Sequence, residues 1–216
     1  MPQINNPVLH RHKLAFFCMP KCANSSVKQS IRVTLRPDIF KLDRKSEIRN
    51  LIKKHGEPFD YEDQYQIDKY KDYLKIGIIR NPFERTISTW AHKINNRPQW
   101  PNLGFWPNMA FEEYVKHIST IPDSKADIHF KSQTSLIAIE NRIVPENIFL
   151  FEDFPGCWKE IQKMVFAWCG LKLPDMPHYN QSKKTRPDLN KMPELKNLII
   201  ERYKKDFELL GYSKNI

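Results

Sequence analysis

The chain has 216 residues, 40% of them hydrophobic, and 35 lysines and arginines against 25 acidic residues give it a formal net charge of +10. This length suits one domain with its own core, and the 12% of aromatic residues argue against general disorder. The charge favours an anionic partner, which could be nucleic acid, an acidic polymer or a phosphorylated cofactor.

The first predicted elements are a buried strand and the helix that follows it. Residues 13–19 form a short apolar run that ends at Pro20, and they predict the strand. The helix after it has an apolar residue at every fourth position and ends at Pro37. A charged helix is predicted over 44–54. Residues 1–12 are expected to be a flexible lead-in.

Two more strands follow, the first of them buried, and each leads into a helix. The strands are predicted over 74–79 and 147–151. The remaining helices are predicted over 83–93, 111–117, 158–168 and 194–210. Strands that alternate with helices predict right-handed crossovers. We therefore expect a single α/β domain over 1–216, with a central parallel sheet flanked by helices and ligands bound beyond the C-terminal strand ends.

The segment 95–108 has three prolines, several aromatic residues and no periodicity, so it is expected to be a loop. Trp100 and Trp106 would suit a lid that faces a ligand. The more frequent alternative is that such aromatic residues fill a small core of their own.

Several kinds of site have no signature in this sequence. The six glycines never form the G-x-G-x-x-G or G-x-x-x-x-G-K-[ST] patterns of dinucleotide-binding and Walker A loops. Cys18, Cys22, Cys157 and Cys169 have no zinc-ligand spacing, so we expect reduced thiols and no metal. No stretch approaches the roughly 18 apolar residues of a membrane span, and no signal peptide is visible. We therefore expect a cytoplasmic protein, provided that the sequence is full length.

Residues 20–26 have the composition of a phosphate-binding loop between a strand and a helix. Their small side chains let successive backbone N–H groups converge on an anion, and the helix N-terminus adds partial positive charge. Lys21, Ser25 and Ser26 supply further donors. A plain loop with a serine N-cap, in which Lys21 is a solvated side chain, fits the same residues equally well.

A second anion-binding cluster, residues 80–88, follows the strand predicted over 74–79. Arg80 and Ser88 could hold another phosphate, the arginine through its bidentate guanidinium and the serine through its hydroxyl. An alternative of similar weight is that Asn81 and Pro82 only start a helix and that Arg80 binds a carboxylate.

The two clusters together resemble a known family. Residues 17–28 (Phe-Cys-Met-Pro-Lys-Cys-Ala-Asn-Ser-Ser-Val-Lys) are similar to the 5′-phosphosulfate loop of sulfotransferases that use 3′-phosphoadenosine 5′-phosphosulfate (PAPS), and residues 79–90 resemble their 3′-phosphate motif. Three later segments, 148–154, 177–183 and 201–212, are similar to the carbohydrate sulfotransferase and bacterial family 2 group. This chain departs from the pattern in having Cys-Ala-Asn where many relatives have glycine, and in lacking a proline before Gln133.

The resemblance implies a P-loop-kinase-like sulfotransferase fold, and transfer of the sulfuryl group of PAPS to a hydroxyl of a carbohydrate acceptor by in-line displacement without a metal. Lys21 would neutralise charge on the leaving oxygen. The nucleotide-binding residues that it implies are Cys22, Ala23, Asn24, Ser25 and Ser26 at the 5′-phosphate, Arg80 and Ser88 at the 3′-phosphate, and Ser182 and Lys183 in a late loop. For the late loop, a solvated charged run is an equal alternative.

The acceptor hydroxyl needs a general base, for which the sequence offers three candidates. His55 is preferred because it lies between the first two motifs, where related sulfotransferases carry a catalytic histidine or glutamate. His129 is the second candidate and Glu57 the third. Solvated or structural roles are expected for the other histidines.

Two rival functions fit parts of the sequence. An ATP-dependent small-molecule kinase would use the first loop for phosphates, but the sequence has neither a Walker A loop nor an evident magnesium-binding acid. A basic, non-enzymatic nucleic-acid-binding protein would suit the charge and the aromatic residues. The preferred partner is the hydroxyl acceptor and not nucleic acid. The expected source is a bacterium or virus, or the Golgi lumen if the chain is a trimmed fragment.

Overall fold

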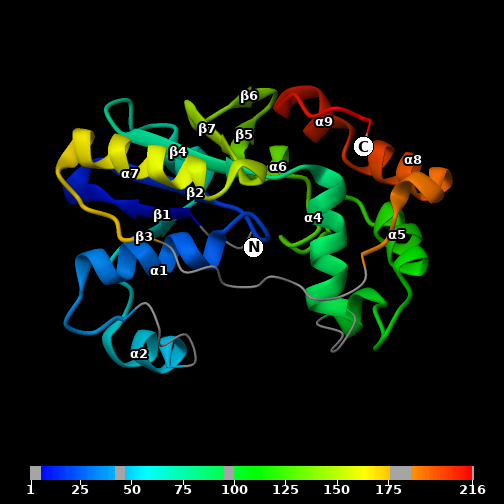
Figure 1. Ribbon diagram of the computed structural model, residues 1–216, viewed down its shortest axis with the longest axis horizontal. Coiled ribbons are helices and arrows are strands. Elements are labelled where there is room, and N and C mark those ends of the chain that lie inside the picture. The colour runs from blue at the N-terminus through cyan, green and yellow to red at the C-terminus, as the bar shows by residue number, and fades with distance from the viewer. Residues whose placement is uncertain (1–5, 42–46, 95–99, 176–185, 216) are drawn as a thin grey trace. The chain divides into compact units, whose positions relative to one another are not determined.

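The computed structural model of the protein describes residues 6–41, 47–94, 100–175 and 186–215. Its central element is a five-stranded sheet with the strand order β3-β1-β2-β4-β7 (Figure 1). The strands of this sheet are β1 (Asn6–Leu9), β2 (Leu14–Cys18), β3 (Asp60–Glu62), β4 (Leu74–Ile79) and β7 (Asn147–Leu150). Helices flank the sheet, which confirms the predicted α/β class.

The three strands predicted from apolar runs form the parallel part of the sheet. Cys18 of β2 lies opposite Ile78 of β4, and Ile78 lies opposite Phe149 of β7. All of β2 and all but the first residue of β4 are buried, which explains why their sequences are continuous apolar runs. The C-terminal ends of β2 and β4 therefore lie side by side at one edge of the sheet.

The other two strands make the sheet mixed, so the prediction of a purely parallel sheet is wrong at one side. β1 pairs antiparallel with both β2 and β3. A 3-10 turn, His10–His12, reverses the chain between β1 and β2. The predicted flexible lead-in is wrong from residue 6 onwards, because β1 is buried between two partner strands and the Asn6 side chain accepts a hydrogen bond from the Cys18 N–H at 3.3 Å. Residues 1–5 lie outside the described part.

The chain divides into two compact units, and each is built from two stretches of sequence. The first unit contains residues 1–79 and 144–180, and the second contains residues 80–143 and 181–216. Among the described residues, no helix is both long and apolar enough to cross a bilayer.

The first unit contains the sheet and the helices that cover it. These helices are α1 (Asn24–Leu35), α2 (Ile48–His55), α3 (Gln64–Ile67) and α7 (Gly156–Cys169). Helices α1 and α7 lie on opposite sides of the sheet (Figure 1). Ile31 of α1 and Ile161 and Val165 of α7 are fully buried, so each helix contributes an apolar face to the core.

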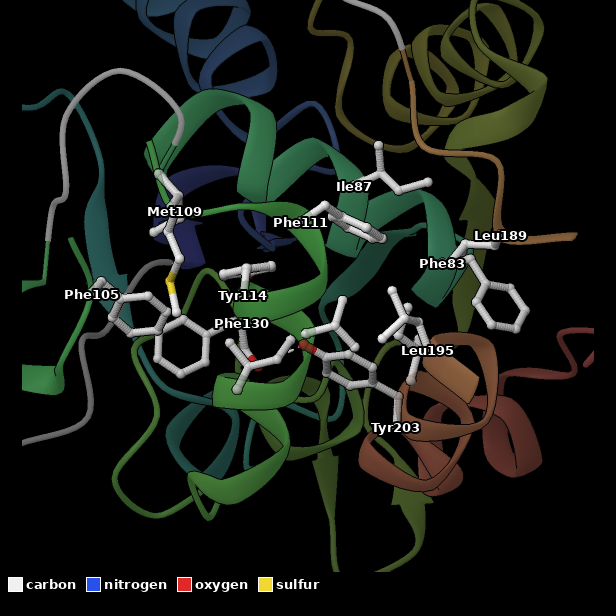
Figure 2. Close-up of a cluster of buried hydrophobic side chains, with 14 of the residues drawn as sticks. Phe83, Ile87, Phe105, Met109, Phe111, Tyr114, Phe130, Leu189, Leu195 and Tyr203 are labelled. Atoms are coloured by element: carbon white, nitrogen blue, oxygen red, sulfur yellow. Dashed lines mark hydrogen bonds between the residues drawn. The ribbon is translucent and has the colours of Figure 1, made fainter. Parts of the chain in front are cut away.

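The second unit is helical and has its own hydrophobic core, which includes Tyr114, Phe130 and Ile199 (Figure 2). Its elements are α4 (Pro82–Thr89), α5 (Phe111–Thr120), α6 (Thr134–Ile137), the hairpin β5 (Ala138–Ile139) and β6 (Arg142–Ile143), α8 (Pro193–Arg202) and α9 (Lys204–Leu210). The long helix predicted over 194–210 is interrupted at Tyr203, whose buried hydroxyl donates to the Phe130 carbonyl at 2.9 Å.

The described part of the segment 95–108 shows that one of its tryptophans is a packing residue. The Trp100 ring lies 5.5 Å from that of Phe105 and 5.3 Å from that of Phe130, measured between centroids. Trp106 is 46% exposed. Trp100 therefore fits the alternative of a small aromatic core, whereas a lid role for the loop remains a prediction.

Candidate active site

The loop between β2 and α1 has a strained backbone. Lys21 has φ 72° and Ala23 has φ 56°, both in the left-handed region that favours glycine. For other residues this conformation costs roughly 1–2 kcal/mol each. The Cys22 N–H donates to the Met19 carbonyl at 3.2 Å, which closes a tight turn. Residues other than glycine thus adopt a conformation that favours glycine, and such strain clusters at ligand-binding sites.

The loop ends at the N-terminus of α1. The helix starts at Asn24, one or two residues before the serines that were expected to cap it, and Ala23 supplies no side-chain cap. Among the described residues, the buried Oδ1 atom of Asn24 has no hydrogen-bond partner. The Ser26 N–H donates to the Ala23 carbonyl at 2.9 Å. The amides of Cys22 and Ser26 therefore already bind carbonyls, and those of Ala23, Asn24 and Ser25 suit an anion best.

A buried ion pair joins Arg32 of α1 to Glu57. Arg32 donates to both carboxylate oxygens of Glu57, at 2.8 and 2.6 Å, and the Tyr61 hydroxyl donates to the same carboxylate at 2.9 Å. The Lys28 ammonium lies 4.6 Å from the centre of the Tyr61 ring, and burial lowers the pKa of Lys28 to about 8. Glu57 was the third candidate for the base. Both of its carboxylate oxygens are already hydrogen-bonded, which suits a structural role better. The carboxylate would have to give up its contact with Arg32 before it could accept a proton from a substrate.

The Cys18 thiol at the end of β2 is not suited to act as a nucleophile. All four cysteines are free, as expected, and Cys18 and Cys22 are buried. Burial raises the pKa of Cys18 to about 12, and that of Cys157 to about 11. Cys18 therefore stays protonated at neutral pH and acts as a small packing residue.

In the second unit, α4 presents the residues of the predicted 3′-phosphate motif. The Asn81 side chain accepts from the Phe83 N–H at 2.9 Å and caps the helix, and Pro82 occupies its first turn. Glu84 and Ser88, four residues apart, lie on the partly exposed face of α4, whereas Phe83 is buried. The capping residues thus start α4 immediately after Arg80.

Arg80 binds a carboxylate in this structure. Its Nη2 atom lies 3.4 Å from Oε2 of Glu84, and Arg186 binds the same oxygen. The Arg80 side chain is 14% exposed. Two guanidinium groups therefore share one acidic side chain, and guanidinium donors of this kind also suit a phosphate.

The buried face of α4 holds the segment that carries His129. Arg85 is buried and donates to the carbonyls of Lys131 at 2.7 Å and Ile128 at 2.9 Å. The Thr89 hydroxyl donates to the carbonyl of His129 at 3.0 Å. The helix that follows Arg80 therefore also positions the second candidate for the base.

His129 has the surroundings of a general base. Its Nδ1 atom lies 2.6 Å from Oδ1 of Asp127, and its ring lies 5.5 Å from that of Trp100. Burial lowers the pKa of His129, and the hydrogen bond with Asp127 partly opposes this shift. A neutral ring that donates from Nδ1 to Asp127 leaves Nε2 as a proton acceptor.

The predicted residues thus fall into three groups. Lys21 to Ser26 form the end of the β2–α1 loop and the first turn of α1 in the first unit, whereas Arg80, Ser88 and His129 are placed around α4 in the second unit. His55 is the exposed last residue of α2, in the first unit. Ser182 and Lys183 lie outside the described residues.

Sequence reasoning missed three residues that bear on Arg80, namely Gln133, Arg186 and Asp206. The side chain of Gln133 binds the backbone of Arg80, and the carboxylate of Asp206 binds the backbone of Gln133. Only Gln133 had a signal in the sequence, as the glutamine of a family-like segment that lacks its usual proline. Arg186 resembles any exposed basic residue next to a lysine run.

Comparison with known proteins adds independent findings. The model of the family described as "Sulfotransferase family" matches residues 7–213. Carbohydrate sulfotransferase 10 of Homo sapiens is 23% identical over 239 aligned positions, which cover 96% of this chain and 66% of that protein. The protein of the same name from Pongo abelii matches to the same extent. The chain thus spans just under two thirds of the length of these relatives. No solved structure matches.

Proposed function

The chain belongs to the sulfotransferase family, and we propose that it transfers the sulfuryl group of PAPS to a hydroxyl of a carbohydrate. The observation that carries this proposal is that two anion-binding motifs follow neighbouring parallel strands. Residues 20–26 follow β2 and residues 80–88 follow β4, and Cys18 lies opposite Ile78 where these strands end. Segments that leave adjacent parallel strands begin at the same edge of a sheet, which is where ligands of α/β proteins bind.

The first motif supports the binding of a sulfated 5′-phosphate. The left-handed turn at Lys21 and Ala23 leads into the N-terminus of α1, and the unpartnered Oδ1 of Asn24 adds a polar group there. Amides at such a terminus bind anions. PAPS, when bound, supplies a sulfuryl group on a phosphate leaving group. We assign to Lys21 the neutralisation of charge on the leaving oxygen.

The second motif supports the recognition of the 3′-phosphate. Arg80 would exchange its contact with Glu84 for a bidentate contact with the phosphate, and Ser88 would donate its hydroxyl. A ligand with phosphates at both the 5′ and the 3′ positions of its ribose has one group for each motif. This is the feature that separates PAPS from ATP, which has no 3′-phosphate.

For the general base we prefer His129 to His55. The support is the hydrogen bond of its Nδ1 to Asp127, which fixes the ring, and its attachment to α4 through Thr89. Its neutral Nε2 would take the proton of the acceptor hydroxyl as that oxygen attacks sulfur. His55 is an exposed side chain at a helix end. The carbohydrate class of the acceptor rests on the two named relatives.

The test is a calorimetric titration with adenosine 3′,5′-bisphosphate and with ATP, combined with an assay of sulfate transfer from PAPS to oligosaccharides. We expect the bisphosphate to bind in the micromolar range, about −8 kcal/mol. Arg80→Ala should weaken it roughly 10- to 100-fold, because a hydrogen-bonded charge is lost. Lys21→Ala should abolish transfer with a smaller loss of binding.

The matched control is Lys116→Ala, which removes an exposed cation on α5 that pairs with Glu112. It should change neither affinity nor transfer. Equal affinity for the bisphosphate and ATP in the wild type and in every variant would overturn the proposed function.

A further inference from the structure

We propose that Gln133 is a positioning residue that fixes the backbone of Arg80, and that Asp206 fixes Gln133 in turn. The inference rests on the proposed function, since Arg80 is the residue assigned to the 3′-phosphate. It adds to that function a chain of hydrogen bonds within the second unit, from α9 to the recognition arginine.

The contact between Gln133 and Arg80 is a double hydrogen bond. Oε1 of Gln133 accepts from the Arg80 N–H at 2.9 Å, and Nε2 of Gln133 donates to the Arg80 carbonyl at 2.7 Å. One side-chain amide therefore satisfies both backbone groups of a single residue, as a neighbouring strand does in a sheet.

Gln133 is itself held from the opposite side. Its backbone N–H donates to Oδ2 of Asp206 at 2.8 Å, and the N–H and hydroxyl of Thr134 donate to Oδ1 of Asp206 at 2.8 and 2.9 Å. Asp206 belongs to α9, and both it and Gln133 are completely buried. Burial raises the pKa of Asp206, and the hydrogen bonds from Thr134 and Gln133 oppose that rise.

A buried amide and a buried carboxylate are costly unless their hydrogen bonds are made, and an apolar residue would fill position 133 without this requirement. The geometry assigns the polar side chain to the backbone of Arg80. Because both backbone groups of Arg80 are fixed, its side chain extends from a fixed position, and less conformational freedom is lost when the guanidinium binds a phosphate. Bidentate recognition is sensitive to small displacements of this kind.

The experiment compares the dissociation constants of adenosine 3′,5′-bisphosphate and adenosine 5′-monophosphate. Their ratio reports the contribution of the 3′-phosphate alone. In Gln133→Met we expect this ratio to fall about tenfold, with the affinity for the monophosphate unchanged within about twofold. Asp206→Asn should lower the ratio less, because one acceptor oxygen remains. In a protein that already carries Arg80→Ala, Gln133→Met should not lower the ratio further, since the two residues act as one unit.

Gln133→Glu tests the contact itself and serves if the methionine variant does not fold. A protonated carboxyl keeps one donor and one acceptor, whereas an ionised one has lost the donor. Relative to the wild type at the same pH, the ratio should therefore recover as the pH is lowered. A merely structural role would weaken both nucleotides alike and would show no such recovery.

Gln162→Met is the matched control, since Gln162 also donates from Nε2 to a backbone carbonyl, that of Leu173 at 2.8 Å, but lies on α7. It should leave the ratio unchanged. If the wild type prefers the bisphosphate and the Gln133 variants keep the full preference, the role given to Gln133 is wrong. If the wild type itself shows no preference, the proposed function fails and this inference fails with it.

Discussion

Burial determines the protonation of His129, and this gives the proposed base a testable pH dependence. The pKa of this histidine is lowered by burial and raised in part by the hydrogen bond with Asp127. A base must be neutral to accept a proton, so activity is lost only as the pH falls through the lowered pKa. The acidic limb of the profile of kcat/KM should therefore lie below the ordinary histidine value of about 6.5.

In Asp127→Asn we expect this limb to move to a still lower pH, because the carboxylate that favours the protonated ring is removed. We also expect kcat to fall by roughly 10- to 100-fold, since the ring loses its orientation. The measurement is kcat/KM between about pH 4.5 and 9. A limb that moves upward would contradict this role. If His55→Gln removed the limb and His129→Gln did not, the base would be His55.

The ion pair of Arg32 and Glu57 should contribute to stability and not to chemistry. Its side chains are 8% and 14% exposed, so Glu57→Gln leaves a buried guanidinium without its counter-charge. We expect the free energy of unfolding to fall by about 3 kcal/mol. The check is urea denaturation, with Glu112→Gln as the control, because that carboxylate pairs with Lys116 on the surface and should have no measurable effect. An unchanged midpoint in Glu57→Gln would contradict this expectation.

At the level of residues, the sequence suggests candidate site residues only where they have a local signature, and it does not reveal residues defined by tertiary contacts. Arg80 and Ser88 were predicted as a site because they stand in one motif beside a predicted strand. Gln133 and Asp206 were not, because their hydrogen bonds join positions 53 and 73 residues apart. Glu57 was assigned a possible chemical role because no local pattern reveals its pairing with Arg32, 25 residues away.

Among the secondary-structure elements, β4 is tightly packed at Gly77. A Cβ atom added to Gly77 would lie 3.0 Å from Cδ1 of Ile148 and 3.1 Å from Cγ of Pro145. The isoleucine terminus can shift, but the proline ring is rigid, so Gly77→Ala should lower stability by about 1–3 kcal/mol. Gly156→Ala at the start of α7 is the control, since an added Cβ there meets nothing within 4 Å. Thermal unfolding of both variants tests this, and equal midpoints would contradict it.

The elements that were predicted correctly are those with a strong pattern of their own. The buried strands β2 and β4 are apolar runs, the half-buried β7 has three apolar residues in a row, and α5 and α7 have a clear helical period. Strand β1 was missed because it is four residues long, contains Pro7 and follows a polar start. It exists through pairing with β2 and β3, which no local pattern encodes.

For the whole molecule, the net charge of +10 should make ligand binding dependent on salt. Raising NaCl from about 50 to about 500 mM shortens the range of electrostatic attraction from more than 10 Å to about 4 Å. We expect the affinity for adenosine 3′,5′-bisphosphate to fall more than that for the 5′-monophosphate, because it carries more negative charge. The measurement is the dissociation constant at four salt concentrations. Parallel curves for the two nucleotides would contradict this.

The interleaving of the two units has a consequence for how the protein is made. The chain passes from one unit to the other after residues 79, 143 and 180, so neither unit is encoded by a continuous piece of the gene. During synthesis on the ribosome, the five-stranded sheet lacks strand β7 until residue 150 has emerged. The early part of the first unit must therefore stay incompletely folded while the later part is synthesised, and a cut after any residue from 80 to 179 would leave neither unit whole in one fragment.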